Sequence, residues 1–502
     1  MSAIVRAEER TIVEINGRSK ESLFDRFLSA VAPRLYHNRQ AHRTAAKIIR
    51  SYEATAKTRR TEGWVSAGSS ANTASAGQLA FLRNLARDLY RNNGWAIRGA
   101  DEIVNNTIGW GIQPRSKSAQ HIALWKAWGG KTSCHAANKL TVYGIESLVL
   151  HTIVLSGECL IRRRTMPTRS GIPLRLEVLE PDCIDSTKNQ DGPGLNRIFE
   201  GVEVNSLGEP VAYWLHKKHP GDSFLVQSER VSAEDVIHAF DVERPGQLRG
   251  PSWLAAAIVT LQDFDDYEDA VLMRQKIAAC FAAFVTNLDG AGVGLDDSTD
   301  EFESLEPGAI VRLNPGDDVK FGTPPPVTDN DAFSKTALRR IAASLGVTYE
   351  GLTGDYSQVN FSSARMARLT HYGNVHHWRW NMMIPQVCER IWEWFEDAAI
   401  IAGKVAGQAE VSWTPPPMPM IEPDREGKAY RQAVRAGQMT HKEMIAEMGN
   451  DPETFFDEYK EGLDEIDKRG IVLDSDARKT TDAGQLQQEP MTKAPGGQEK
   501  NA

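Results

Sequence analysis

Two long helical stretches constrain the fold more than any other feature of this sequence. Apolar residues recur at three- and four-residue steps from residue 252 to residue 284, which predicts one long helix. About 30 residues at 1.5 Å each would make it roughly 45 Å long, longer than most globular helices. A second stretch runs from about residue 362 to residue 402, and Pro385 should kink it because proline lacks an N–H. The apolar positions are Leu254, Ile258, Leu261, Phe264, Tyr267, Val271, Ala278 and Phe281 in the first stretch, and Leu369, His376, Met383, Val387, Ile391, Trp394 and Ala398 in the second.

Residues 141–240 carry strand signals and predict a small mixed β domain. A short helix around 144–155 precedes the first strand, and a turn of four to five residues around Gly208 indicates a hairpin. The expected strands are 158–162, 174–179, 199–204, 210–216 and 236–240.

Shorter helices are expected on both sides of these elements. An amphipathic helix starts at Leu79, with Arg83, Arg87 and Arg91 on its polar side and a possible interruption at residues 92–94. Residues 66–77 are small and polar, which predicts a loop or strap. Another helix near 330–345 should stop at Gly346. Later helix starts are marked by a capping box of Thr440 with Glu443, and by Asp451 followed by Pro452.

The composition is that of a folded protein. The 502 residues carry a formal charge of −9, with 41% hydrophobic and 25% charged residues. The longest apolar run has nine residues, against the roughly 20 that span a bilayer, and no signal peptide is recognised. Five scattered cysteines without a CxxC pair indicate reduced thiols. We therefore expect a soluble intracellular protein with no membrane contact.

Charge is unevenly spread along the chain. The first 100 residues hold 17 Lys and Arg against 8 Asp and Glu. Such a basic arm suits nucleic acid or an acidic partner, although a solvated arginine-rich helix is the more common meaning. The remainder of the chain is acidic, which argues against tight binding of phosphates.

No catalytic, cofactor or metal site is predicted. Gly130-Lys131-Thr132 resembles the end of a P-loop, but Trp125 stands where the motif requires glycine, so a surface turn is expected. The acidic run at residues 263–269 lacks the Gly and Glu of a calcium loop and indicates a solvated helix face. His376 and His377 are adjacent on a helix and point apart, so we expect one packed and one exposed. HExxH and GxSxG motifs are absent from the sequence.

Seven stretches in the same order resemble the lambda-type portal proteins of tailed bacteriophages. They cover roughly residues 80–400, and the match weakens in the first 60 and the last 80 residues. The stretches are Arg87-Asp88-Leu89-Tyr90-Arg91-Asn92-Asn93, Asn106-Thr107-Ile108-Gly109-Trp110-Gly111-Ile112, Ser156-Gly157-Glu158, Leu179-Glu180-Pro181-Asp182, Gly208-Glu209-Pro210-Val211-Ala212-Tyr213-Trp214, Arg244-Pro245-Gly246-Gln247-Leu248-Arg249-Gly250, and Ala342 through Glu350 running on to Asp355-Tyr356-Ser357 and Asn360-Phe361-Ser362-Ser363-Ala364-Arg365.

The resemblance implies a non-enzymatic α+β subunit of a ring of about twelve copies at the unique capsid vertex. Through its channel double-stranded DNA would pass loosely during packaging and ejection. The implied partners are the terminase large subunit, the major capsid and scaffold proteins, and the head-completion and tail connector proteins. The implied location is the virion, after synthesis in the host bacterial cytoplasm.

The family architecture of wing, stem, clip and crown maps onto the chain by ranges. The implied divisions are a basic arm (1–78), a wing (79–250), a first stem helix (251–285), a clip (286–328), a second stem helix (329–350), a tunnel loop (351–361), a long kinked helix returning to the wing (362–414), crown helices (415–474) and a disordered tail (475–502).

The resemblance places a loop that faces DNA at Asp355, Tyr356, Ser357, Gln358, Val359 and Asn360. Asp355 is its one charged residue, and a polar, mildly acidic rim would let the DNA backbone slide because it offers no cation to the phosphates. A surface loop without DNA contact remains the plainer alternative. At the level of function, the alternatives are a head-morphogenesis adaptor or connector ring that does not thread DNA, a generic scaffold, and a packaging ATPase, which would need a complete P-loop.

Overall fold

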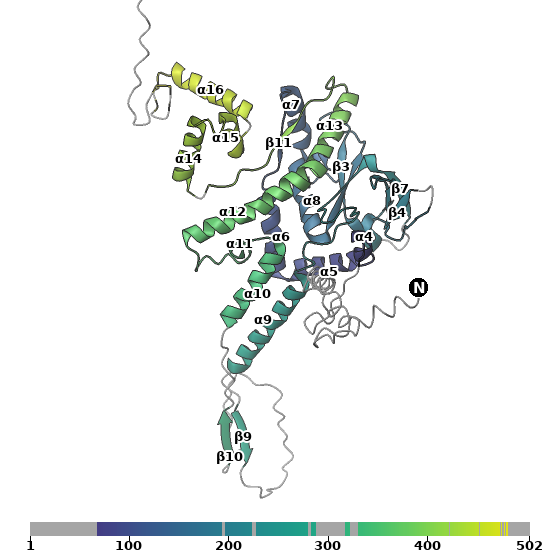
Figure 1. The fold of residues 1–502 in the computed structure, drawn as a ribbon, viewed down its shortest axis with the longest axis vertical. Coiled ribbons are helices and arrows are strands. Elements are labelled where there is room, and N and C mark those ends of the chain that lie inside the picture. The colour runs from purple at the N-terminus through teal and green to yellow at the C-terminus, as the bar shows by residue number, and fades with distance from the viewer. Residues whose placement is uncertain are drawn as a thin grey trace, which may run out of the picture. The chain divides into compact units, whose positions relative to one another are not determined.

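A computed structural model describes residues 68–192, 196–222, 227–279, 283–287, 317–321, 330–420, 422–450 and 452–471, with 473, 476, 478 and 479. From Ser70 onward these residues form one compact unit of helices and small antiparallel sheets, so the expected α+β class is confirmed (Figure 1). Most of the expected basic arm, clip and tail lies outside the described residues.

A helical core holds the rest of this unit together. Helix α5 (Leu79–Asn92) ends where Asn93 begins α6 (Gly94–Thr107), and the Asn93 side chain accepts hydrogen bonds from the N–H groups of Trp95 and Ala96. The expected interruption is therefore confirmed, and its cause is an N-cap. Helix α8 (Val142–Ser156) is apolar on nearly all sides and is buried against α5, α6 and strand β2.

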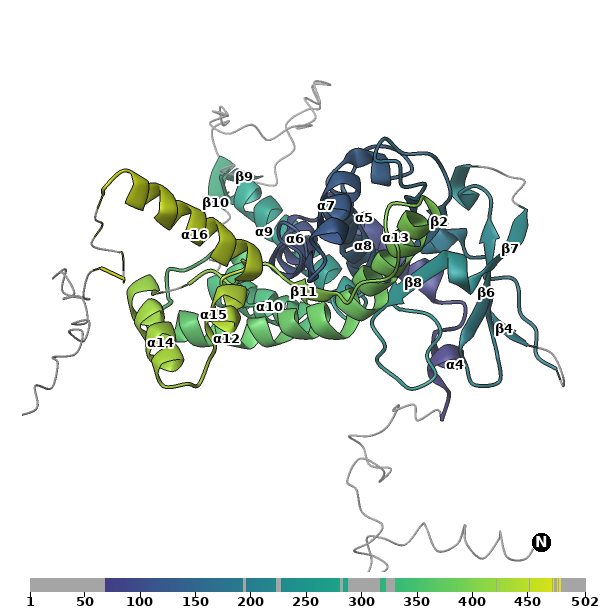
Figure 2. The same cartoon turned by 90° about the horizontal axis from the view of Figure 1, so that it is seen from above.

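Two sheets make up the β region, and the expected strands at 158–162, 174–179, 210–216 and 236–240 are present. The single strand expected at 199–204 was wrong: it is two short strands, because the chain turns at Glu200 and Gly201, which both have a positive φ. The strand at 228–232 was not predicted. In the first sheet, β2 (Glu158–Arg164) pairs antiparallel with both β3 (Arg175–Leu179) and β8 (Val236–Phe240). The second is an antiparallel meander on the opposite side of the helical core from helices α14 (Pro423–Arg435), α15 (His441–Glu447) and α16 (Pro452–Lys468) (Figure 2). Its strands are β4 (Arg197–Phe199), β5 (Val202–Val204), β6 (Pro210–His216) and β7 (Ser228–Ser232).

The first long helix is shorter than expected at both ends. Helix α9 spans Ile258–Ala279, and Leu254 lies in turns before it, although its side chain is still buried. At the other end, strand β9 (Ala283–Asn287) pairs antiparallel with β10 (Asp317–Phe321). Phe284, Val285 and Thr286 suit a pleated strand, and pairing with a distant segment overrides the helical spacing. Phe281 lies outside the described residues.

Helix α10 (Asn330–Leu345) runs beside α9 and stops as expected at Gly346. Gly346 has a φ of +68°, and the N–H of Val347 donates to the carbonyl of Ala342, which closes the helix end. The side-chain hydroxyl of Tyr267 donates to Asn330 Oδ1 over 2.8 Å and links the two helices. Short helix α11 (Tyr349–Thr353) follows.

The second long stretch is continuous but changes its helical type at the middle. Helix α12 (Phe361–His377) passes into a π-helix (Trp378–Cys388) that contains Pro385, and then into α13 (Glu389–Ile401). Proline removes one backbone donor, and the wider turn absorbs that loss. The expected apolar positions from Met383 onward are buried, but Leu369 is 51% exposed and His376 is exposed. For these two positions the prediction was wrong.

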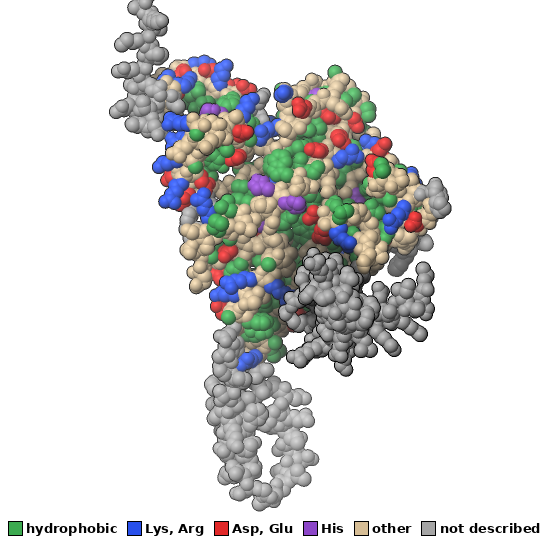
Figure 3. Space-filling view, in the orientation of Figure 1, with side chains coloured by type: hydrophobic (Ala, Val, Ile, Leu, Met, Phe, Trp, Pro, Cys, Tyr) green, Lys and Arg blue, Asp and Glu red, His purple; other side chains and the backbone are tan. Residues whose placement is uncertain are grey.

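The C-terminal helices are α14 (Pro423–Arg435), α15 (His441–Glu447) and α16 (Pro452–Lys468), and charged side chains of both signs cover them (Figure 3). The capping box of Thr440 and Glu443 is confirmed at the start of α15, whereas Asp451 lies outside the described residues. The expected loop at 66–77 instead contains a short helix, α4 (Ala71–Ser75), capped by Ser70.

Aromatic side chains fill one end of the main core. Trp125 and Trp128 of α7 (Ala119–Gly129) pack against Trp392 and Phe395 of α13, with ring centroids 5.1–5.4 Å apart. Strands β1 (Gln113–Arg115) and β11 (Ser412–Thr414) pair near this cluster and bring Trp413 to it. Within the described residues, no helix has the length and apolar character needed to cross a membrane.

Candidate functional site

The six residues of the predicted channel loop form one polar turn between α11 and α12. Tyr356 is 63% exposed, and Ser357 and Gln358 are exposed with it. Asn360 ends the turn as the N-cap of α12 by accepting a hydrogen bond from the N–H of Ser363 over 2.9 Å. The structure thus brings the six residues together. Their place in a channel stays a prediction.

Asp355 holds the shape of this turn. Its carboxylate accepts hydrogen bonds from the N–H of Ser357 (3.0 Å) and from the Tyr349 hydroxyl (3.4 Å). The hydrogen bonds from Ser357 lower the pKa of Asp355, and the positive charge of Lys335 adds to the effect. The carboxylate is therefore ionised at neutral pH and gives the turn its one negative charge.

The base of the loop is fixed to the helical core. Arg98 Nε of α6 donates to the carbonyl of Gly351 over 3.0 Å. A side chain at Gly351 would approach Glu102, also on α6, to 2.8 Å. The tip of the turn is consequently free while its start is held in place.

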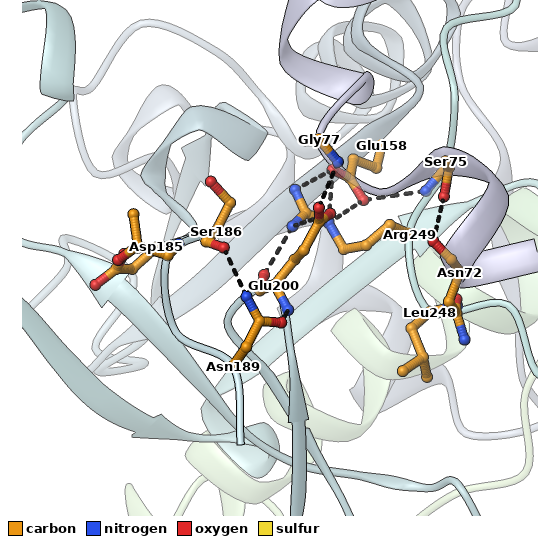
Figure 4. Close-up of polar contacts among 12 residues, drawn as sticks. Asn72, Ser75, Gly77, Glu158, Asp185, Ser186, Asn189, Glu200, Leu248 and Arg249 are labelled. Atoms are coloured by element: carbon orange, nitrogen blue, oxygen red, sulfur yellow. Dashed lines mark hydrogen bonds and ion pairs between the residues drawn. The ribbon is translucent and has the colours of Figure 1, made fainter. Parts of the chain in front are cut away.

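A buried ionic cluster lies elsewhere in the unit, and the residue chemistry alone did not predict it. Glu158, at the start of β2, has no solvent exposure. It accepts three hydrogen bonds from Arg249, of 2.6–2.9 Å, and one from the N–H of Gly250. His238 Nε2 lies 3.0 Å from the same carboxylate. Figure 4 shows Arg249 between Glu158 and Glu200, whose carbonyl accepts a further hydrogen bond of 2.8 Å.

Opposite charges keep this carboxylate ionised. Burial by itself raises the pKa of Glu158, but the charge of Arg249 and the hydrogen bonds from His238 and Arg249 outweigh it and lower that pKa well below its usual range. A paired charge is the form in which a carboxylate can be buried at tolerable cost. The cluster therefore acts as a fixed joint of the fold.

Two arginines of α5 extend the cluster and correct the prediction of a polar helix side. Arg83 is only 4% exposed, 3.6 Å from Glu158 and 3.3 Å from Asp182. Arg87 Nη2 lies 2.7 Å from Asp182 and 3.2 Å from Glu180. The physical reason is that two buried or partly buried carboxylates require cations, which a helix wheel cannot show. Arg91 is exposed, as expected.

Close backbone contacts complete the joint. Gly157 has a φ of +88°, and a Cβ there would collide with the carbonyl oxygen of Gly250. Asn72 accepts a hydrogen bond from the N–H of Leu248 and donates one to the carbonyl of Gly246. Four of the seven motif stretches thus meet here. The resemblance of these stretches to a known family was the only sign in the sequence that they matter.

The other candidate residues form no site of their own. Lys131 and Thr132 are exposed in the turn after α7, which confirms the surface turn. His376 and His377 are both exposed, because Val375 before them and Trp378 after them occupy the buried positions of the helix, so the expectation of one packed histidine was wrong. Glu180, Asp182 and His219 bring ligand atoms within 4.8 Å of one another, but Arg87 already pairs with both carboxylates.

Glu146 is a second buried carboxyl that sequence reasoning missed. It lies inside α8 and accepts a hydrogen bond from the N–H of Ile112 over 2.8 Å. Burial raises its pKa to about 8, and that hydrogen bond only partly opposes the shift. Unlike Glu158, it has no cation partner among the described residues and is largely protonated at neutral pH.

Comparison with known proteins gives the family. The sequence model described as "Phage portal protein, lambda family" matches residues 57–379. This chain belongs to the lambda family of phage portal proteins. The match includes the buried ionic cluster and the turn at 355–360, so both are parts of the family region of this portal-family chain.

Individual relatives are named portal proteins. The chain is 25% identical over 470 residues to the probable portal protein of Halomonas phage phiHAP-1, covering 86% of this chain and 90% of that protein. It is 24% identical to portal protein B of Escherichia phage lambda, covering 64% and 69%. A solved structure, the neck of a native gene transfer agent particle computed with C12 symmetry, aligns at 19% identity and a TM-score of 0.47, covering 74% and 94%.

Proposed function

We propose that this protein forms the ring-shaped portal at the unique vertex of a phage capsid, through which double-stranded DNA is packaged and later ejected. The observation that carries the proposal is membership of the lambda portal family over residues 57–379. The relatives named portal proteins support it.

The parts of the subunit are proposed to serve the ring as follows. Helices α9 and α10 form the stem, and residues 286–328 between them form the clip. The β region belongs to the wing, and α14–α16 form the crown. In support, α9 and α10 lie together as a pair of long helices below the β region and α12 in Figure 1.

The turn at 355–360 is proposed to border the channel. Each Lys or Arg that contacts a phosphate adds affinity through counterion release, which would slow the movement of DNA. This turn is exposed at its tip and carries a single, negative charge. A surface of that kind repels the DNA backbone weakly and lets it slide.

The proposed partners follow from this place in the particle. Further copies of the chain complete the ring, in a number of about twelve. The terminase large subunit docks on it during packaging, the capsid and scaffold proteins surround it, and head-completion and tail connector proteins bind it later. The protein itself is proposed to catalyse no reaction, and to reside in the virion after synthesis in the bacterial cytoplasm.

A connector ring without a role in threading DNA is the alternative, and a packaging ATPase is the remote one. Cryo-electron microscopy of the purified protein, with mass photometry of the same sample, separates these functions. We expect a closed ring with an axial channel wide enough for duplex DNA and with residues 355–360 beside it. A closed ring without such a channel would contradict the portal function and leave the connector alternative.

A further inference from the structure

One face of α9 carries acidic residues and large apolar residues that are exposed in the described part of the chain. Val259, Asp266 and Met273 follow one another at seven-residue steps, so they lie on one side of the helix. Val259 is 69% exposed and Met273 57% exposed. Asp269 lies on the same side, one turn beyond Asp266.

The aspartates on this helix are not in ion pairs with any cation of the described residues. Asp263, Asp265, Asp266 and Asp269 are exposed, and within the described residues no Lys, Arg or His forms an ion pair with them. Five acidic residues crowd into seven positions at 263–269. Such a face repels itself, and cations placed against it would relieve that repulsion.

The exposed face of α10 has the opposite character. Ala332, Thr336, Arg340 and Ala343 lie on one side of the helix and are exposed. Arg340 has no ion-pair partner among the described residues, and Arg339 beside it has only the ring of Tyr349, 5.5 Å from its guanidinium carbon. Figure 3 shows Lys and Arg side chains gathered over α10.

These two faces cannot satisfy each other within one chain. The packing of α9 on α10 uses other residues, since Tyr267 bonds Asn330 and its ring lies 4.3 Å from that of Phe333. The exposed faces therefore remain available to another molecule.

The faces fit each other in both charge and size. Asp266 and Asp269 match Arg339 and Arg340 in number and sign. Val259 and Met273 flank the acids as large knobs, whereas Ala332, Thr336 and Ala343 flank the arginines as small residues that leave room for them. Val259 and Met273 are about 21 Å apart along their helix, and Ala332 and Ala343 about 16 Å along theirs, so the two faces have comparable lengths.

We propose that the Val259–Asp266–Met273 face of α9 binds the Thr336–Arg340–Ala343 face of α10 in a second copy of this chain. The contact joins two different faces, so each copy uses one face on each side and the assembly closes into a ring when the rotation closes. A two-fold contact of α9 with itself would set Asp266 and Asp269 against the same acids and is unfavourable. This inference deepens the proposed function and rests on its ring.

Charge reversal on one face tests the contact. The Asp266→Arg/Asp269→Arg variant and the Arg339→Asp/Arg340→Asp variant should each lower the ring fraction in mass photometry by roughly tenfold or more, because like charges then face each other at every contact. Asp397→Arg, the same kind of substitution at one exposed position of α13, is the control and should assemble as the wild type does.

Restoring opposite charges distinguishes a broken contact from a misfolded chain. The variant with all four substitutions should form rings again, since every contact regains opposite charges. A one-to-one mixture of the two charge-reversed variants should also form rings, with the two chains alternating.

The results distinguish this contact from the portal function. If the wild type forms rings and the charge-reversed variants form them equally well, the contact is overturned and the portal function is not affected. Loss of rings without restoration in the combined variant and in the mixture would also overturn it. Absence of rings from the wild type would instead contradict the ring on which both depend.

Discussion

Glu158 and Arg249 form a buried ion pair between residues 91 positions apart in the sequence. Glu158 is fully buried and Arg249 is only 2% exposed, so each is stabilised almost entirely by the other and by the polar groups around them. Breaking such a pair by removing one partner leaves an uncompensated charge in a medium that solvates it poorly. The strength of the joint therefore depends on both residues.

The Arg249→Met variant tests this joint. Its free energy of unfolding should fall by about 3–5 kcal/mol, because Glu158 loses its main cation. Urea denaturation of the purified chain at neutral pH measures the change. Arg91→Met, which breaks an exposed pair with Asp88, is the control and should cost less than about 1 kcal/mol. Equal losses in the two variants would contradict the role of the buried pair.

Glu146 should make stability depend on pH in the opposite sense to a salt-bridged carboxylate. The folded chain keeps the proton up to about pH 8, whereas the unfolded chain releases it near pH 4.5. Between these values Glu146 lowers the stability by about 1.4 kcal/mol per pH unit, and below and above them its contribution is constant.

The Glu146→Gln variant should lose this dependence, since glutamine does not titrate and still accepts the hydrogen bond of Ile112. Measured by urea denaturation, it should become more stable than the wild type as the pH rises from about 5 to about 8. Glu389→Gln, an exposed carboxyl at the start of α13, is the control. If the free energy of unfolding depends on pH in the same way in Glu146→Gln and in the wild type, Glu146 is not the source of the pH dependence.

At the scale of elements, two glycines allow β2 and the segment before α9 to touch. A Cβ on Gly157 would collide with Gly250 and Pro251, and a Cβ on Gly250 with Gly157 and Phe240. The ionic cluster needs this approach, because Gly250 donates its N–H to Glu158.

The Gly157→Ala variant should therefore be far more damaging than Gly208→Ala. Both glycines have a positive φ, near +85° to +88°, so both changes carry the cost of left-handed backbone, about 1–2 kcal/mol. A Cβ on Gly208 meets open space, whereas Gly157 adds an overpacking cost of about 1–3 kcal/mol or more. Thermal unfolding of the two variants measures the difference, and similar melting temperatures would contradict the close contact.

The turn at 355–360 makes a separate prediction about DNA movement. Gln358→Lys should leave rings intact and slow packaging severalfold at low salt, because the new ammonium contacts phosphates that pass it. Asp355→Lys and Ser357→Lys should act likewise, although Asp355 also holds the turn. Gln408→Lys, at an exposed position outside this turn, is the control in a packaging assay. Normal packaging by Gln358→Lys at low salt would remove the turn from the channel.

For the whole molecule, the proposed role requires a channel for DNA and does not require ATP hydrolysis. The purified chain should not hydrolyse ATP above background, because the turn after α7 lacks the glycine loop that cradles phosphates. A phosphate-release assay measures this, with Lys131→Ala as the control. Hydrolysis that disappears in Lys131→Ala would revive the packaging ATPase.

Features that depend on local order could be predicted from the amino-acid sequence. Helical spacing, the interruption at residues 92–94, the stop at Gly346 and the capping box at Thr440 all follow from contacts within a few residues. The seven motif stretches indicated the portal family in the same linear way, and the family match confirmed them.

Which side chains are buried and which segments pair depends on the folded chain as a whole. Helical spacing predicts Arg83 on the polar face of its helix, but in the folded chain Glu158 and Asp182 lie against it and it is buried. The stretch after Ala279 had helical spacing, but β9 formed because β10 lies beside it. Burial and strand pairing depend on residues tens to hundreds of positions apart, and their free energy arises only when the chain has brought those residues together.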